Sequence, residues 1–474
     1  MTARPKDELT APNRGSLSSA DSAILKQINS FKTDAPDLTY LLENEITNQF
    51  LVWTPDRKAH SENVVTPAQS TTIASSRLNQ KLEEQNQWFD AIRTLGVQLA
   101  AENKFLVTAS GTTTDPFVRR ISELFQIPII ILEPFPKSPT AKWFREKSTG
   151  QGRELQTIAY YKILDNASKT GKAKNVNDLL IAGSQTCFLL SVRNKGNILT
   201  AANRRLDNET QPSSTRLLIN RSLTPKKVEQ ALIENGATAW WLFDKPTNDK
   251  DHQPPQTQTL VKTTQTTRTP ILSLDEIKTE NYLLHWTRRR VGPWPDQTQS
   301  EFIDDLIFQT SRRNHGGISS LCRILASRRV LGSHNLTRDP RSVVCFADLP
   351  LEELPSKRVF RPHLSRWDFE SFGIAIEREL LAQLGTVKAI YGDEEDWAQL
   401  PDEQRPYFQL RKSKSEKIDW ESENEWRLVG DLNLELVPHD QAIVFVKTIE
   451  DANIVAELSH WPIVVIADNS SSKQ

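Results

Sequence analysis

The chain has 474 residues, and its 59 Lys and Arg almost balance its 60 Asp and Glu, so its formal net charge is −1 at pH 7. This balance excludes a general attraction to nucleic acid or anionic membranes, and the length predicts about two to four domains. The three cysteines stand far apart in apolar runs, which argues against a disulfide framework and a zinc site and indicates a reducing compartment. Apolar runs are too short to cross a bilayer, and the amino-terminal residues lack the apolar core of a secretion signal. We therefore expect a soluble, cytoplasmic protein without a membrane partner.

Residues 1–20 predict a disordered tail, and residues 21–243 predict an α/β domain. Short apolar runs typical of buried strands alternate with amphipathic runs typical of helices. Strands are expected at 50–53, 104–108, 127–132, 186–192, 217–219 and 237–243, and helices at 22–32, 78–101, 117–125, 177–183, 198–206 and 223–236. Such alternation predicts a parallel, Rossmann-like sheet.

Two loops of this domain follow a predicted strand and precede a predicted helix. Ligands of parallel sheets bind at the carboxyl ends of strands, and the backbone N–H groups that begin a helix attract phosphate. Both loops are therefore candidate nucleotide-binding loops, although neither contains a complete dinucleotide fingerprint. The alternative is a plain α/β domain with unoccupied loops. The candidate residues are Gly111, Thr112, Thr113 and Asp115 in the first loop and Arg193, Gly196 and Asn197 in the second.

The stretch Val107–Asp115, together with Asp178 and the Val-Arg-Asn-Lys-Gly-Asn stretch at 192–197, resembles the SLOG/DprA-like group of Rossmannoid nucleotide-binding domains. The resemblance covers about residues 40–210. It implies that the domain binds a nucleotide-derived signal, which it senses or processes.

Residues 244–270 are rich in Asp, Asn, Gln, Pro and Thr and predict a linker. Residues 271–474 then predict a C-terminal α+β domain, because short strands are interleaved with short helices. Strands are expected at 282–287, 342–347, 372–376, 387–391, 419–428, 442–446 and 463–466, and helices at 302–310, 319–329 and 377–384.

The stretch Asp419–Gly430 is the best candidate for chemistry. It carries Glu421, Glu423 and Glu425 at two-residue spacing, which on a strand places them on one face together with Arg427. Three neighbouring carboxylates repel one another unless a cation or a ligand uses them. The alternative is a solvated strand face whose charge is balanced by the arginine.

A second resemblance joins this stretch to the start of the domain. His285-x-Thr287 on an early strand, Val-Val-Cys-Phe at 343–346 and Asn-Glu-Trp-Arg at 424–427 resemble ADP-ribosyltransferases, in particular DarT-like toxins and phage-resistance (abortive infection) proteins. The resemblance implies NAD as cofactor and Glu425, Glu423 and His285 as the catalytic set. It also implies that His285 and Thr287 bind NAD. Arg288 is a candidate partner of the pyrophosphate, and Tyr391 is a candidate for stacking on the nicotinamide.

The chemistry suits these residue types, because breaking the N-glycosidic bond of NAD leaves positive charge that a fixed carboxylate stabilises. The chain would then be a mono-ADP-ribosyltransferase-like effector with a nucleotide-sensing domain, acting on a protein or nucleic-acid acceptor in antiphage defence.

Two other functions fit the same residues. A non-enzymatic protein would contact nucleic acid through Arg288–Arg290 and nearby aromatic side chains. A metal-dependent nuclease would hold Mg²⁺ with Asp419 and the three glutamates, with Lys414 or Lys417 nearby. The histidines lack metal-ligand spacing, so we expect no histidine metal site.

Overall fold

The computed structural model describes residues 18–30, 41, 44–55, 67–148, 155–164, 175–208, 215–240, 269–334, 337–361, 366–411 and 424–466. The chain divides into two compact units. The first comprises residues 1–255 and 295–313, and the second comprises residues 256–294 and 314–474. The segment 295–313 thus belongs to the first unit, although the sequence analysis placed it in the C-terminal domain.

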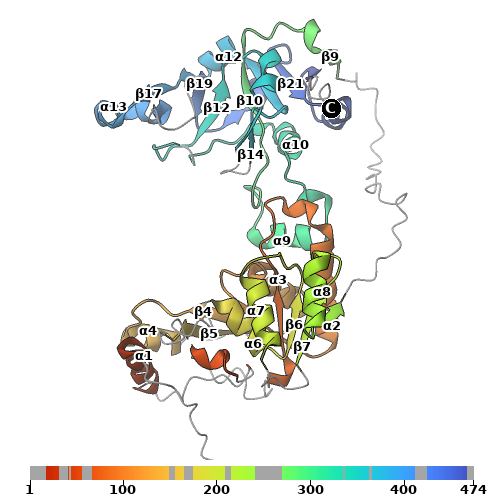
Figure 1. Ribbon diagram of the computed structural model, residues 1–474. Helices are drawn as coiled ribbons and strands as arrows, with labels where there is room; N and C mark the ends of the chain where they lie inside the picture. The colour runs from red at the N-terminus through yellow and green to blue at the C-terminus, as the bar shows by residue number, and fades with distance from the viewer. Residues whose placement is uncertain are drawn as a thin grey trace, which may run out of the picture. The chain divides into compact units, whose positions relative to one another are not determined.

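The first unit is built on one eight-stranded sheet (Figure 1). Its order is β1-β5-β4-β3-β2-β6-β7-β8, and all neighbours are parallel except β1 and β5. The predicted parallel, Rossmann-like α/β sheet is therefore confirmed. The strands are β1 Phe50–Trp53, β2 Ser70–Ala74, β3 Phe105–Ala109, β4 Ile129–Pro134, β5 Gln156–Ile163, β6 Thr186–Leu189, β7 Arg216–Asn220 and β8 Thr238–Trp240.

Helices cover both faces of this sheet. Apolar side chains of α2 and α3 pack on one face, and those of α6, α7 and α8 pack on the other, while α1 and α4 lie in a separate aromatic cluster around Trp53. Coverage on both faces explains why these strands read as continuous apolar runs. The helices are α1 Ser19–Ser30, α2 Asn86–Ala101, α3 Asp115–Phe125, α4 Ala141–Ser148, α6 Val176–Gly183, α7 Asn197–Leu206 and α8 Lys226–Glu234.

The strand β2, which the sequence analysis missed, lies in the middle of the sheet between β3 and β6. Its sequence, Ser-Thr-Thr-Ile-Ala, is polar, yet all five residues are buried. The buried hydroxyl groups are tolerated because they form hydrogen bonds with backbone groups. Thr72 Oγ1 donates to the Val107 carbonyl at 2.7 Å, and Ser70 Oγ accepts from the Gln185 amide at 2.9 Å.

Helix α9, Gln299–Ile307, packs on α2 and α3 as part of the first unit. Its apolar stripe consists of Phe302, Ile303, Leu306 and Ile307, each at most 6% exposed in the core shared with these helices. Arg120 of α3 adds two hydrogen bonds to the Asp304 carboxylate, at 2.7 and 2.6 Å. A helix from the second half of the sequence thus completes the core of the first unit.

The second unit is built on a mixed, mostly antiparallel sheet of order β16-β19-β12-β10-β15-β21-β22-β9. Its strands are β9 Ile271–Ser273, β10 Tyr282–Trp286, β12 Val343–Ala347, β15 Gly373–Glu377, β16 Val387–Lys388, β19 Glu425–Val429, β21 Ala442–Val446 and β22 Ile463–Val465. Three small pairs accompany it: β11 Arg329–Val330 with β20 Leu432–Asn433, β13 Val359–Arg361 with β14 Arg366–Asp368, and β17 Ile390–Gly392 with β18 Phe408–Leu410.

The helices of this unit are short, as expected for the α+β class. One face of the sheet packs on α10 and α14, and the other face contains Leu284, Ala347 and Ala375 in a separate apolar cluster. The helices are α10 Gly317–Ser327, α11 Leu354–Lys357, α12 Arg378–Gln383, α13 Glu394–Gln399 and α14 Ile449–Ala456.

Candidate functional site

The carboxyl edge of the first sheet contains a point where the strand order reverses. Successive strands run from β2 through β3, β4 and β5 on one side, and the chain then returns to place β6, β7 and β8 on the other side of β2. Ligands of open α/β sheets bind at such a point. Two bonds tie the loops there to β2: Thr114 Oγ1 donates to the Ile73 carbonyl at 2.7 Å, and the Leu190 amide donates to the Ala74 carbonyl at 2.9 Å.

The loop after β3 presents backbone donors. Gly111 has φ +81°, which glycine adopts without strain, and a Cβ placed there would meet no atom within 4 Å. Within the described residues, the amides of Gly111, Thr113 and Thr114 donate to no acceptor, whereas the Thr112 amide closes the turn on Ala109. Three N–H groups are thus available at the start of α3.

The loop after β6 is built in the same way. Gly196 caps α7 with φ +130° and ψ 178°, a conformation that is essentially limited to glycine, and it supplies no side chain to bond the first turn. In the described part of the chain, the amides of Asn197, Ile198 and Leu199 donate to no acceptor. The second loop therefore also offers N–H groups and the positive end of a helix dipole.

Basic side chains accompany this second loop. The Arg193 amide donates to Ser76 Oγ at 3.1 Å, and its Nη2 donates to the Arg77 carbonyl at 2.6 Å, so the loop after β2 orients the guanidinium. Arg193 and Lys195 are exposed. Sequence reasoning missed Ser76 because β2 had not been recognised; the β-branched Thr-Thr-Ile run was the available signal.

Asp115 is placed differently from the other candidates of the first loop. It is 8% exposed, and its carboxylate accepts from Arg119 Nε at 2.8 Å and from Thr108 Oγ1 at 3.3 Å. Burial opposes the charge on Arg119, but the bond to Asp115 and the charge of Glu133 raise its pKa above the ordinary value. Asp115 is therefore part of an internal ion pair and not a group facing the loop amides.

His285 and Thr287 of the second unit are both engaged by backbone carbonyls. His285 Nδ1 lies 2.9 Å from the Cys345 carbonyl, and burial lowers the pKa of the imidazole, so the ring stays neutral at pH 7 with Nδ1 as the donor. Thr287 is 3% exposed, and its hydroxyl donates to the Gly317 carbonyl at 2.8 Å. Thr287 thus joins the end of β10 to the start of α10.

Glu425 forms an ion pair with Arg427, two residues along β19. Arg427 Nε and Nη2 lie 3.1 and 3.0 Å from the two carboxylate oxygens. The guanidinium is buried, at 2% exposure, and its other N–H groups donate to the carbonyls of Pro406 and Phe408 and to Gln409 Oε1. Every N–H of this side chain therefore has an acceptor, and Glu425 supplies the charge that balances it.

The structure does not bring His285 and Glu425 together. Leu284 pairs with Ala347, and Ala347 pairs with Glu425, so these three side chains point to one face of the sheet. His285 alternates to the other face, where its ring lies 5.9 Å from Phe346. The expected arrangement, with both side chains around one NAD, is therefore absent.

The remaining predicted NAD residues do not complete a single site either. Arg288 Nη2 lies 3.5 Å from Asp368, and its guanidinium lies over the Trp286 ring, 5.5 Å from the centroid. Tyr391 lies on β17, close enough to Arg427 for their charges to interact. Glu423, Glu421, Asp419, Lys414 and Lys417 fall outside the described residues.

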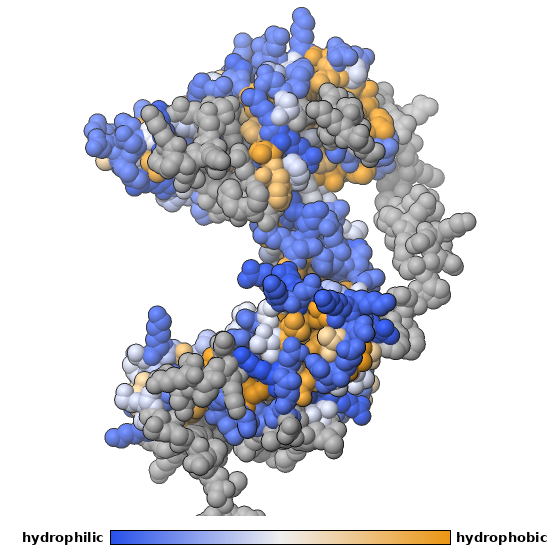
Figure 2. All heavy atoms as spheres, viewed as in Figure 1, coloured by the Kyte–Doolittle hydropathy of each residue, from blue (hydrophilic) through white to orange (hydrophobic). Residues whose placement is uncertain are grey.

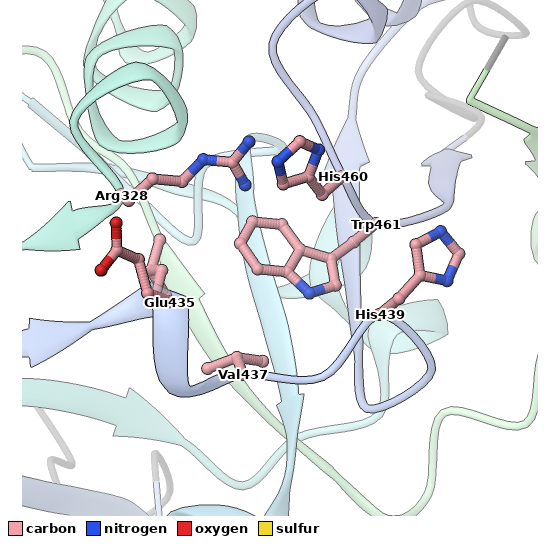
Figure 3. A pocket seen from close by; sticks show the side chains of 7 residues that line it. Arg328, Glu435, Val437, His439, His460 and Trp461 are labelled. Carbon is pink, nitrogen blue, oxygen red and sulfur yellow. The ribbon is translucent and has the colours of Figure 1, made fainter. Parts of the chain in front are cut away.

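A pocket of about 410 Å³ lies elsewhere in the second unit (Figure 3). The Arg328 guanidinium lies over the Trp461 ring, 5.4 Å from the centroid, with His460 and His439 on the same side of the pocket as the indole (Figure 3). Burial, followed by the charges of Arg328 and His439, lowers the pKa of His460. None of the residues predicted from the sequence lines this pocket.

Within the described ranges, no group of three or more His, Cys, Asp or Glu side chains is arranged to hold a metal ion. In the same ranges, no helix combines the length and the apolar character that a membrane crossing requires.

No family model matches the chain, and no curated protein matches it. Among solved structures, the chain is similar to DNA processing protein A from Helicobacter pylori, a structure described for its single-stranded DNA binding mode. The match covers 42% of this chain and 89% of that chain, with 16% identity and a TM-score of 0.25. A TM-score this low supports no inference about function.

Proposed function

We propose that the first unit binds a nucleotide through its phosphates, at the carboxyl edge of the sheet where β3, β2 and β6 end. The observation that carries the proposal is the pair of glycine loops at the point of strand-order reversal. Each loop has a glycine at positive φ and three backbone amides that donate to no acceptor within the described residues. Free N–H groups at the start of a helix attract anions, so two such sets at one edge favour an anionic ligand.

The spacing of the loops favours a ligand with more than one polar group. The loops follow β3 and β6, which flank β2, and neighbouring strands lie about 4.8 Å apart, so the loops begin about 10 Å apart. A single inorganic phosphate would contact one loop only. A nucleotide would place its phosphates at one loop and its ribose or base near the other.

The charges of the second loop favour the same ligand. Arg193 is held by Ser76 and Arg77, and Lys195 stands beside Gly196 on the exposed side of the loop. A fixed guanidinium forms charge-assisted bonds with phosphate oxygens.

The test is calorimetric titration of the full chain with ADP, ATP and inorganic phosphate. We expect ADP and ATP to bind more tightly than phosphate. Gly196→Ala should weaken nucleotide binding about tenfold, because a Cβ is strained at this backbone conformation and displaces the first turn of α7.

Gly236→Ala is the matched control. Gly236 also has positive φ, at +104°, and a Cβ at this position would meet no atom within 4 Å, but it precedes β8 and therefore lies at the opposite edge of the sheet. The Gly236→Ala variant should lose stability as Gly196→Ala does and keep its nucleotide affinity. Equal affinity in wild type and Gly196→Ala would refute the proposed site.

A further inference from the structure

The antiparallel ribbon of β13 and β14 displays two aromatic side chains that the fold does not bury. Phe360 pairs with Trp367 across the ribbon, so both point to one face, and their ring centroids are 5.3 Å apart. They are 44% and 40% exposed. Hydrophobic residues also reach the surface at other points of the molecule (Figure 2), but here two large rings share one short element.

The opposite face of the ribbon anchors it to the second unit. Asp368 is 1% exposed and lies 3.5 Å from Arg288 Nη2. The next residue, Phe369, has φ +57°, a strained conformation for a bulky side chain, and its ring packs 5.0 Å from that of Trp286. The inner face therefore holds the ribbon in place, and the outer face presents the aromatic pair.

One arginine lies against the aromatic pair, and further basic groups lie near it around Glu370. The Arg358 guanidinium lies 4.4 Å from the centroid of Trp367, and its Nη2 lies 3.3 Å from Glu370. Arg289 and Lys447 also interact with the Glu370 carboxylate. Of these basic groups, Arg358 is the one that lies against the aromatic pair itself.

We infer that this aromatic ribbon is a binding surface for single-stranded nucleic acid, with bases stacked on Phe360 and Trp367 and a phosphate near Arg358. Aromatic platforms beside basic groups are the usual means of binding unpaired bases, because every base has a π face to stack. In a duplex the bases are already stacked on one another, so the platform selects single strands. The site is independent of the nucleotide site proposed for the first unit.

The test is fluorescence anisotropy of a labelled oligothymidylate titrated with the full chain, with the corresponding duplex as competitor. We expect the single strand to bind, the duplex to compete poorly, and affinity to fall as salt rises. Trp367→Ala and Phe360→Ala should each weaken binding about fivefold or more, and Trp367→Phe should restore most of the affinity because it keeps a stacking ring.

Two controls distinguish binding at the aromatic ribbon from binding elsewhere on the chain. Phe308→Ala removes an aromatic residue of the first unit that is 46% exposed, and it should leave affinity unchanged. The double variant Arg193→Ala/Lys195→Ala should keep oligonucleotide binding, which separates this surface from the proposed nucleotide site.

Three results would overturn the inference. They are no binding of the single strand by wild type at low salt, unchanged affinity in both Trp367→Ala and Phe360→Ala, or loss of binding only in the Arg193→Ala/Lys195→Ala variant. A shift from dimer to monomer in Trp367→Ala, measured by light scattering without any change in oligonucleotide affinity, would instead assign the ribbon to self-association.

Discussion

The two regions that the sequence marks as candidate sites use their polar groups in opposite ways. At the carboxyl edge of the first sheet, backbone N–H groups of two glycine loops donate to no acceptor within the described residues. On β19 of the second unit, Glu425 and Arg427 bond to each other, and every N–H of the guanidinium has an acceptor.

The difference teaches that clustered charge is a weaker sign of a binding site than unsatisfied donors. A buried guanidinium needs a carboxylate whether or not the site has chemistry to perform. Backbone amides at the start of a helix have no acceptor within the helix and are therefore available to an anionic ligand. The ion pair gives Glu425 a structural partner, and the amides that are free within the described residues are the basis of the ligand proposed for the glycine loops.

The largest effect is expected from Arg427→Met. The substitution leaves Glu425 without its cation and three acceptors without donors, which should lower the free energy of unfolding of the second unit by about 3–5 kcal/mol. Urea unfolding of the full chain measures this loss in the free energy of unfolding. Arg329→Met is the control, because that arginine is 59% exposed and its pair with Asp431 should contribute at most about 1 kcal/mol.

Glu425→Gln tests the structural assignment directly. It removes the charge opposite the buried Arg427 and should cost about 1.5–3 kcal/mol of stability. Release of nicotinamide from NAD, followed by chromatography, should be the same in the variant and in wild type. If the variant were as stable as wild type but no longer released nicotinamide, Glu425 would be catalytic and not structural.

Arg193→Ala/Lys195→Ala should weaken nucleotide binding about tenfold, or about 1.4 kcal/mol, because both exposed cations lie beside the loop amides. Thermal unfolding should hardly change. Lys142→Ala/Lys388→Ala removes the same charge from exposed positions elsewhere and should keep wild-type affinity. Equal losses in both double variants would mean that net charge, not the loop, attracts the ligand.

The smallest effect concerns His285, on the face opposite Glu425. Burial lowers the pKa of its imidazole in the folded state, so the unfolded chain takes up the proton first as the pH falls below about 6.5. This residue therefore makes stability decline on acidification, by at most about 1.4 kcal/mol per pH unit. Urea unfolding at pH 7.5 and 5.5 should show a smaller decline in His285→Asn than in wild type.

Much of the fold was predictable from local pattern. The apolar run at 127–132 predicted a buried strand and the amphipathic run at 117–125 predicted a helix, and the structure has β4 and α3 at these places. The alternation along β19 also placed Glu425 and Arg427 on one face and Leu428 on the other, as the register confirms. Local pattern does not show which strands pair or in what register. His285 on β10 and Glu425 on β19 are separated by β12, and the register of β12 with both strands puts the two side chains on opposite faces.

Two elements, β2 and α9, show why the remaining parts of the fold could not be predicted from local sequence. The polar strand β2 looks like a loop because its stability comes from hydroxyl bonds to Val107 and Gln185 in neighbouring segments. Helix α9 has a clear apolar stripe, but the stripe does not say which sheet it covers. Its partners, α2 and α3, lie about 200 residues earlier in the sequence.

The placement of α9 has a consequence for biosynthesis. Proteins emerge from the ribosome amino-terminus first, and domains usually fold as they emerge. Here the surface of α2 and α3 that packs against Leu306 and Ile307 remains exposed to solvent until the ribosome has translated α9. The first unit is therefore expected to mature late during translation, and a nascent chain that stops before residue 295 should expose this apolar surface to chaperones.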